Sequence, residues 1–175
     1  MAVDTTLTWP DGRQRCRWCN PQNPLYIAYH DAEWGVPCHD DHRLFEMLVL
    51  EGFQAGLSWE CVLNKRDGFR QAFDGLDASV IARYPDEKLE ALRQDSRIIR
   101  NKLKIRAART NARVFLAIQE EWGSFDAYGW KGHIRTGLYP VSSVGSDFGR
   151  PQETGHDLCR YDHHLCLSAG YGRHL

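Results

Sequence analysis

The spacing of apolar residues between about positions 40 and 122 constrains the fold of this chain more than any other feature. Apolar side chains recur there with the period of an α-helix, and strand-like alternation is scarce. Asp40 and Asp41 are typical N-cap residues for a first helix, Gly56 interrupts that helix, and Ser58 can cap a second one. The residues that share helical spacing in the first helix are Leu44, Phe45, Met47, Leu48 and Phe53.

Two later helices extend the pattern. Pro85 followed by two acidic residues is typical of a helix start. A long helix is expected from about Lys102 to Glu121, and Gly123 should end it. Its inward-facing residues would be Ile105, Ala108, Ala112, Phe115 and Ile118. The sequence therefore predicts an all-α protein.

Composition and the ends of the chain suggest where the protein works and how it is divided. No apolar run reaches the length of about 18 residues that a membrane span needs, so we expect no membrane association. The first residues lack the apolar core of a secretion signal, which favours a cytoplasmic protein with reduced or metal-binding cysteines. We expect a flexible N-terminus over 1–14, one domain over 15–130 and an irregular tail over 131–175.

A basic stretch, residues 97–119, contains seven Lys or Arg side chains and no acidic one. These cations cannot all face the core, and a concentrated positive face suits a polyanion such as DNA. The turn that leads into the long helix could also offer backbone N–H groups to a phosphate. The alternative is an ordinary solvated helix face.

Two other features indicate chemistry. Cys16 and Cys19 have the spacing of zinc ligands, with His30 following, although a pair of buried cysteines explains them equally well. Glu51 lies on an otherwise apolar helix face, with Trp59 on the same side. A buried carboxylate beside an aromatic plane suits a flat cationic ring, but Glu51 could instead cap a helix or pair with an arginine.

One further stretch, "LYIAYHDAEWGVP" at residues 25–37, fits neither a helix nor a strand pattern, and we interpret it as a segment whose side chains line a site. Together with "RCRW" (15–18), "LEGFQAGLSW" (50–59) and "IIRNKLKIRAARTNARVFL" (98–116), it resembles the DNA-3-methyladenine glycosylase I family. The likeness runs from about Arg15 to Trp130.

That resemblance implies a helix-hairpin-helix glycosylase fold and hydrolytic release of 3-methyladenine from alkylated double-stranded DNA. It implies that Glu51 accepts hydrogen bonds from the flipped base, that Tyr29 and Trp59 flank the base, and that Trp34 lies near. The hairpin residues expected to bind the DNA backbone are Arg97, Arg100, Asn101, Lys102 and Lys104. No lysine stands out as a Schiff-base nucleophile, so we expect a monofunctional enzyme, and we expect a monomer.

The resemblance also implies a structural zinc ion, bound by Cys16, His30 and a histidine and a cysteine near the C-terminus; Cys19 has no counterpart in the family pattern. After Trp130 the family pattern disappears. Reading back-translated codons for "PQETG" (151–155) one base later permits Leu-Lys-Lys-Arg-Gly, a family-like sequence, and the segment that follows permits "MTFVGTTIIYAYLQAMGVI". We therefore interpret the chain from somewhere between about 129 and 146 as a frameshifted family C-terminus that lacks two of the four zinc ligands.

Two alternatives to an active glycosylase remain at this point. The chain could be a catalytically inactive, truncated homologue that retains only DNA binding, or a small zinc-binding interaction protein built around Cys16, Cys19 and His30. Base release separates the first from an enzyme, and zinc content without DNA affinity would indicate the second.

Overall fold

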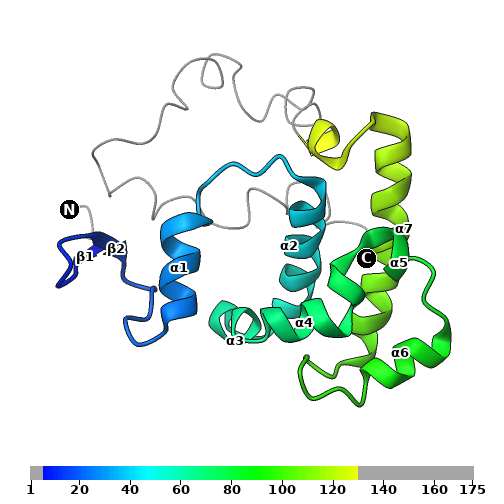
Figure 1. Ribbon diagram of the computed structural model, residues 1–175, viewed down its shortest axis with the longest axis horizontal. Coiled ribbons are helices and arrows are strands. Elements are labelled where there is room, and N and C mark those ends of the chain that lie inside the picture. The colour runs from blue at the N-terminus through cyan, green and yellow to red at the C-terminus, as the bar shows by residue number, and fades with distance from the viewer. Residues whose placement is uncertain (1–5, 130–175) are drawn as a thin grey trace. The chain divides into compact units, whose positions relative to one another are not determined.

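The computed structural model describes residues 6–129, and these fall into two compact units, 6–37 and 38–129. Figure 1 labels the helices and strands in chain order. The first unit contains β1 (Thr6–Thr8), β2 (Gln14–Cys16) and α1 (Pro24–Ala32). The second is helical throughout its described part, which confirms the predicted all-α class. Its elements are α2 (Asp41–Gln54), α3 (Trp59–Leu63), α4 (Arg66–Ala72), the 3-10 turn η1 (Asp74–Leu76), α5 (Ala78–Ile81), α6 (Asp86–Leu92) and α7 (Lys102–Trp122).

A short β-hairpin, residues 6–16, begins the described part of the first unit and overlaps the segment 1–14 that was expected to be flexible. β1 and β2 pair antiparallel, with Leu7 opposite Arg15. The turn closes through hydrogen bonds from Gly12 N to Trp9 O and from Trp9 N to Arg13 O, each 2.9 Å long. Gly12 has a φ of 77°, which glycine adopts at little cost. Three-residue strands are too short to show alternating apolar and polar residues, so the sequence pattern did not predict the hairpin.

The α1 helix corrects the interpretation of residues 25–37 as non-helical. Asn23 caps it by accepting hydrogen bonds from Leu25 N and Tyr26 N, and Pro24 occupies its first turn. Its buried face consists of Tyr26 and Tyr29, three residues apart, rather than a stripe of aliphatic side chains. Because this helix is short and its buried residues are aromatic, the sequence pattern did not predict it.

In the second unit, the predicted helix boundaries are confirmed by the caps. Asp40 Oδ1 accepts from Arg43 N at 2.8 Å, and Ser58 Oγ accepts from Cys61 N at 3.2 Å. Gly123 ends α7 in the left-handed conformation with a φ of 84°. In each case a polar side chain or a glycine satisfies backbone groups that the helix end leaves without intrahelical partners.

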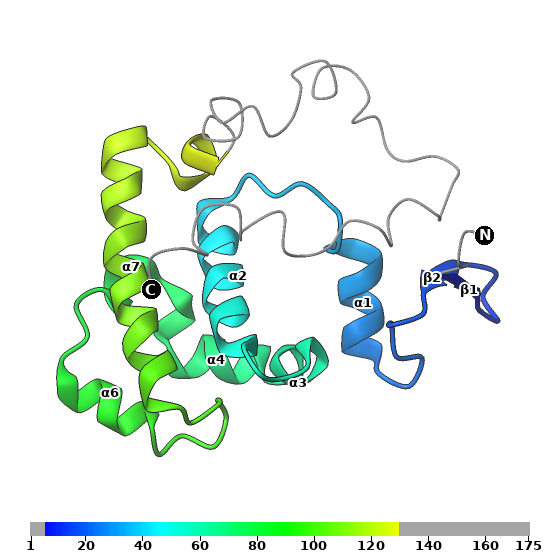
Figure 2. The same cartoon turned by 180° about the vertical axis from the view of Figure 1, so that it is seen from behind.

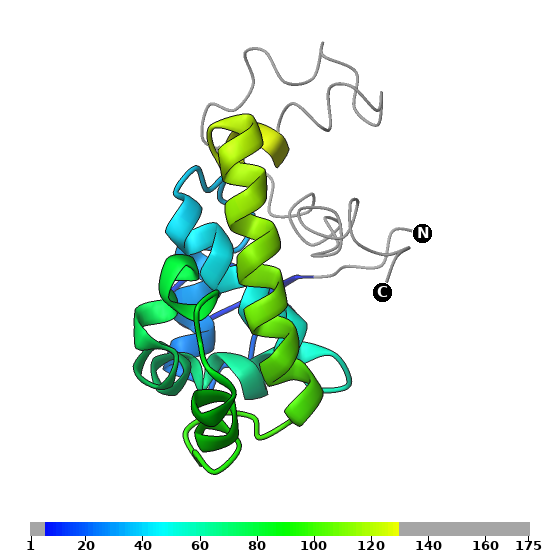
Figure 3. The same cartoon turned by 90° about the vertical axis from the view of Figure 1, so that its right-hand side faces the viewer.

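The long α7 helix organises this unit by contacting α2, α5 and α6. Figures 2 and 3 show α7 from behind and from the side, and in Figure 2 α6 sits beside its N-terminal end. The buried residues of α7 are Ile105, Ala108, Ala112 and Phe115. They meet an aromatic core in which the Phe53 and Phe69 ring centroids lie 4.7 Å apart and those of Phe45 and Phe115 lie 5.0 Å apart. Burying such side chains contributes about 1.5–3 kcal/mol each.

One carboxylate ties the start of α2 to the chain after α7. Asp41 accepts hydrogen bonds from Gln119 Nε2 at 2.6 Å, Phe125 N at 2.8 Å and Asp126 N at 2.9 Å. Burial would raise the pKa of Asp41, but these three donors outweigh it and hold the pKa below its usual value. No helix in the described part is long and apolar enough to span a membrane.

Candidate functional site

Glu51 lies one turn before the end of α2, and its side chain is only partly buried. The buried carboxylate of α2 is instead Glu46, whose residue is 2% exposed. Glu46 accepts a short hydrogen bond from Arg66 and pairs with Arg70 at 2.8 Å. The expectation that Glu51 is buried among apolar side chains is therefore wrong. Glu46 was missed, although it shares helical spacing with buried Leu50 and Phe53.

Trp59 begins α3 directly after the turn that follows α2, and its side chain is buried. In the turn, Gly56 has a φ of 80°, and Leu57 N donates to Gln54 O at 2.6 Å. Helices α2 and α3 pack against each other. The structure thus places Glu51 and Trp59 on two packed helices joined by one tight turn, as the sequence suggested.

Tyr29 and Trp34 belong to an aromatic cluster in the first unit. The rings of Tyr26 and Tyr29 stack with centroids 6.5 Å apart, and those of His30 and Trp34 stack at 5.6 Å. Trp18 contacts this cluster with its centroid 5.3 Å from that of Trp34 and 5.2 Å from that of His30. Sequence reasoning did not single out Trp18, although it stands in the quoted segment "RCRW".

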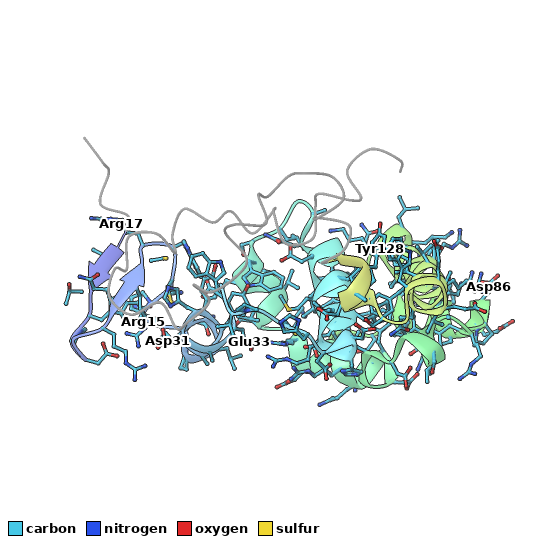
Figure 4. All side chains as sticks on the ribbon, turned by 90° about the horizontal axis from the view of Figure 1, so that it is seen from above. Arg15, Arg17, Asp31, Glu33, Asp86 and Tyr128 are labelled. Carbon is cyan, nitrogen blue, oxygen red and sulfur yellow. The ribbon has the colours of Figure 1, made fainter. Side chains whose placement is uncertain are left out.

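A buried arginine fixes the hairpin to α1 within this unit. Arg15 is 3% exposed, and it donates to Asp31 Oδ2 at 2.6 Å and to Asp11 Oδ2 at 2.9 Å. Its guanidinium also lies 4.5 Å from the centroid of the Trp9 ring. Hydrogen bonding from Arg15 lowers the pKa of Asp31 to about 2. Figure 4 labels Arg15 and Asp31, which come from neighbouring elements of the same unit.

The two predicted zinc ligands lie close together, because Cys16 N donates to His30 Nε2 at 3.2 Å. The other ring nitrogen of His30 lies 3.0 Å from Asp31 Oδ1, so both ring nitrogens are engaged within the unit. Among residues 6–129, no group of three or more His, Cys, Asp or Glu side chains could hold a metal ion. Zinc prefers four ligands, so the described residues do not by themselves fit a zinc site. The other two implied ligands, a histidine and a cysteine near the C-terminus, are the ones expected to be lost in the frameshifted tail, which is outside the described residues.

Cys38 and His39 follow His30 in the sequence and carry side chains of the kind that bind zinc, but both have other contacts. Cys38 Sγ donates to Asp40 O at 3.8 Å, and His39 Nδ1 lies 2.9 Å from Asp126 Oδ1. Both belong to the second unit, whereas Cys16 and His30 belong to the first. Cys19 is buried, and its thiol donates to Tyr26 O at 3.9 Å.

The basic stretch divides into cations that hold the fold together and cations that face solvent. Arg109 donates to Tyr84 O at 2.9 Å and to Asp86 at 2.8 Å, Arg113 donates to Ala82 O at 2.9 Å, and Asp86 is labelled in Figure 4. Lys104 donates to Phe53 O at 2.8 Å and to Ala55 O at 2.5 Å. These three side chains bind backbone oxygens at the ends of other segments.

The remaining cations of the basic stretch are exposed to solvent. Arg97 is half-exposed and pairs with Asp95 at 2.6 Å, which lowers the pKa of Asp95 to about 2. Arg100, Lys102 and Arg106 are exposed and form no ion pair with another described residue. Asn101 caps α7 by accepting from Leu103 N at 3.0 Å and Lys104 N at 3.2 Å, so it already satisfies two of the backbone donors there. The exposed positive surface therefore contains fewer cations than the seven of the basic stretch.

Comparison with known proteins shows which family the chain belongs to. The family described as methyladenine glycosylase matches residues 18–141. The chain belongs to this family. It is 48% identical over 117 residues to DNA-3-methyladenine glycosylase 1 of Escherichia coli (strain K12), an alignment that covers 67% of this chain and 62% of the relative. The family predicted from the quoted segments is thus confirmed.

Solved structures of methyladenine glycosylases have the same fold as this chain. A crystal structure of 3-methyladenine DNA glycosylase I is 50% identical, has a TM-score of 0.64, and is matched over 67% of this chain and 64% of that one. A structure showing the basis of 3-methyladenine recognition by the enzyme from Staphylococcus aureus is 32% identical, with a TM-score of 0.61 over 63% of this chain and 58% of that one. The chain spans 62% of the length of the curated relatives it matches.

Proposed function

We propose that this protein is a base-excision repair glycosylase that hydrolyses the N-glycosidic bond of 3-methyladenine in alkylated DNA. The observation that carries this proposal is the match to the methyladenine glycosylase family over residues 18–141, a range that contains Glu51 and Trp59. The relatives are named DNA-3-methyladenine glycosylases, and one solved relative is described by its recognition of 3-methyladenine.

The chemistry of the damaged base suits the residues at the end of α2. An adenine methylated at N3 is cationic, so its glycosidic bond is weakened: the base leaves with the bonding electron pair as a neutral molecule, and water adds to the sugar carbon and releases a proton to solvent. The enzyme must hold the flipped base and distinguish it from normal adenine. Because Glu51 is partly exposed, its carboxylate can accept hydrogen bonds from the base. We propose that Trp59 contacts an aromatic face of the cation. That Tyr29 flanks the base on the other side, with Trp34 near, stays an expectation from the family resemblance.

For the DNA backbone, we propose that Arg100 and Lys102 contact phosphates, with Arg97 and Asn101 beside them. Arg100 and Lys102 are exposed and flank the N-cap of α7, where the positive end of the helix dipole adds to their charge. We propose double-stranded alkylated DNA as the partner and a monomeric, cytoplasmic enzyme. A zinc ion at Cys16 and His30 would require two ligands from outside the described residues.

Release of free 3-methyladenine from alkylated duplex DNA tests the proposal directly. We expect the protein to release the base without cutting the strand. We expect Glu51→Gln to lower the rate about 100-fold, a typical cost of removing one preorganised electrostatic contact. Glu90→Gln is the matched control, because Glu90 is an exposed carboxylate on α6 that pairs with Arg93. Equal rates for the two variants would contradict the role given to Glu51.

A second candidate function is a catalytically inactive homologue that binds DNA only. The observation in its favour is that the match covers 62% of the curated relatives' length. Such a protein would bind undamaged duplex DNA with a steep dependence on salt and release no base from alkylated DNA.

A further inference from the structure

Lys104 contacts the end of another helix, although it belongs to the stretch expected to bind DNA. It lies in the first turn of α7, and its ammonium donates to Phe53 O at 2.8 Å and to Ala55 O at 2.5 Å. Phe53 is in the last turn of α2, and Ala55 is its C-cap. The last carbonyls of a helix have no intrahelical donors, and a cation is favoured there by the helix dipole.

The segment that Lys104 holds joins the two residues proposed to contact the base. Glu51 lies on the last turn of α2, and Trp59 begins α3 after the turn 55–58. The turn is tightly built, with Gly56 at a φ of 80° and Leu57 N bonded to Gln54 O at 2.6 Å. A shift of the Ala55 carbonyl would therefore change the relative placement of Glu51 and Trp59.

Side-chain packing leaves space at this junction. A cavity of about 220 Å³ lies between the end of α2 and the first turns of α7. Its lining includes Gly52 and Ala55 from the first and Ala107 from the second, all with small side chains or none. The lysine stem crosses this junction and ends on two backbone oxygens. Where apolar contacts are few, hydrogen bonds from a charged donor can hold the end of α2 in position against the first turns of α7.

The same first turn of α7 carries exposed cations. Lys102 is two residues before Lys104, and Arg100 precedes the N-cap Asn101. We propose that Lys104 is a positioning residue, which links the DNA-binding end of α7 to the turn between Glu51 and Trp59 and does not itself contact phosphate. This proposal rests on the proposed function for its role in base recognition, whereas the link between α7 and the turn is independent of it.

The test compares Lys104→Met with Lys104→Arg and Lys102→Met in the full chain. Lys104→Met removes the ammonium and keeps the length of the side chain, Lys104→Arg keeps a charged donor, and Lys102→Met removes the exposed neighbouring cation. Three quantities are measured for each protein: amide hydrogen exchange, affinity for free 3-methyladenine, and the salt dependence of binding to undamaged duplex DNA.

For Lys104→Met we expect faster exchange at the amides of Leu57 and Cys61 by about tenfold, because the turn loses the two charge-assisted hydrogen bonds from the Lys104 ammonium. We expect the amide of Ile105, which donates to Asn101 O at 3.0 Å inside α7, to keep its exchange rate. Affinity for free 3-methyladenine should fall about tenfold, the salt dependence should not change, and Lys104→Arg should recover most of the loss. Lys102→Met should instead reduce the salt slope by about 0.9 and leave the turn amides as they are.

Two results would overturn the inference. If Lys104→Met reduces the salt slope like Lys102→Met and leaves the turn amides unchanged, Lys104 is a phosphate contact. If exchange rises equally across α2, α3 and α7, Lys104 contributes only general stability. Should the unaltered chain fail to bind 3-methyladenine, the proposed function is wrong, and the exchange data still decide whether Lys104 holds the turn.

Discussion

Glu46 and Glu51 show how two carboxylates on one helix acquire different roles through burial and partners. Glu46 is 2% exposed and contacts the guanidinium groups of Arg66 and Arg70, whereas Glu51 is partly exposed near the end of α2. Removing one member of a buried ion pair leaves the other members buried without a counter-charge. Glu46 is therefore a structural carboxylate that links α2 to α4, whereas the partial exposure of Glu51 is what the role proposed for it requires.

We expect Glu46→Ala to lower the free energy of unfolding by about 3–5 kcal/mol, since Arg66 and Arg70 would then lose the buried carboxylate that both of them contact. Urea denaturation measures this change. Asp67→Ala is the matched control, because Asp67 also pairs with Arg70 but its side chain is 79% exposed. That change should cost less than about 1 kcal/mol. A loss for Glu46→Ala as small as the control's would show that Glu46 is solvated in solution.

Individual site residues were only partly predictable from the sequence. Helical spacing placed Glu51 and Trp59 near one turn, but it could not decide which side of α2 faces the core, so Glu51 was expected to be buried. The run of cations around Lys104 and Arg109 indicated a polyanion, yet their partners are carbonyl oxygens far away in the chain, at Phe53 and Tyr84. Contacts between distant segments leave no local pattern in a sequence.

At the scale of elements, caps explain which predictions succeeded. Asp40, Ser58 and Gly123 mark helix ends through local hydrogen bonds or a left-handed backbone, and all three ends are confirmed. Helix α1 and the β1–β2 hairpin were not predicted, because one is anchored by aromatic rings and the other is held by the Arg15 network. Both depend on packing within the first unit rather than on local spacing.

Two glycines in neighbouring helices should respond oppositely to the same substitution. A Cβ at Gly68 of α4 would lie 2.5 Å from the carbonyl oxygen of Arg97, whereas a Cβ at Gly52 of α2 meets nothing within 4 Å. We expect Gly68→Ala to destabilise the protein by about 1–3 kcal/mol through overpacking. Gly52→Ala should stabilise it by about 0.5–1 kcal/mol by restricting the unfolded chain.

Thermal unfolding of the two alanine variants measures both effects. Gly68→Ala should also weaken duplex DNA binding, because it displaces the backbone at Arg97 just before the exposed cations of the hairpin. Similar melting temperatures for both variants would mean that α4 and the segment around Arg97 are not in the close contact seen here.

At the scale of the whole molecule, the family match ends at residue 141, and the chain spans 62% of the curated relatives' length. The match thus continues past Trp130, where we expected the family pattern to end, and the codons of 151–155 and of the segment after them permit a family-like reading one base later. The frameshift therefore stays a prediction about the coding DNA, and it bears on the predicted zinc site because the described residues supply only two of four ligands.

We expect resequencing of the coding DNA from codon 120 onward to reveal one inserted or missing base. The protein made from the restored frame should bind one zinc ion per chain, as measured by metal analysis, and melt at a higher temperature, since a structural zinc site contributes directly to folding free energy. If the reading frame holds as printed, the tail is genuine and the predicted four-ligand site is wrong for this chain.

The hydrogen bonds of Asp41 bear on whether the helical unit could be circularly permuted. The Asp41 carboxylate accepts hydrogen bonds from the N–H groups of Phe125 and Asp126, so residues 84 and 85 positions apart in the sequence meet at one point. Because the two ends of this segment lie close together, they could be linked covalently, and new termini could be made elsewhere without disrupting the packing. The segment from α2 to the end of α7 is thus a natural candidate for circular permutation.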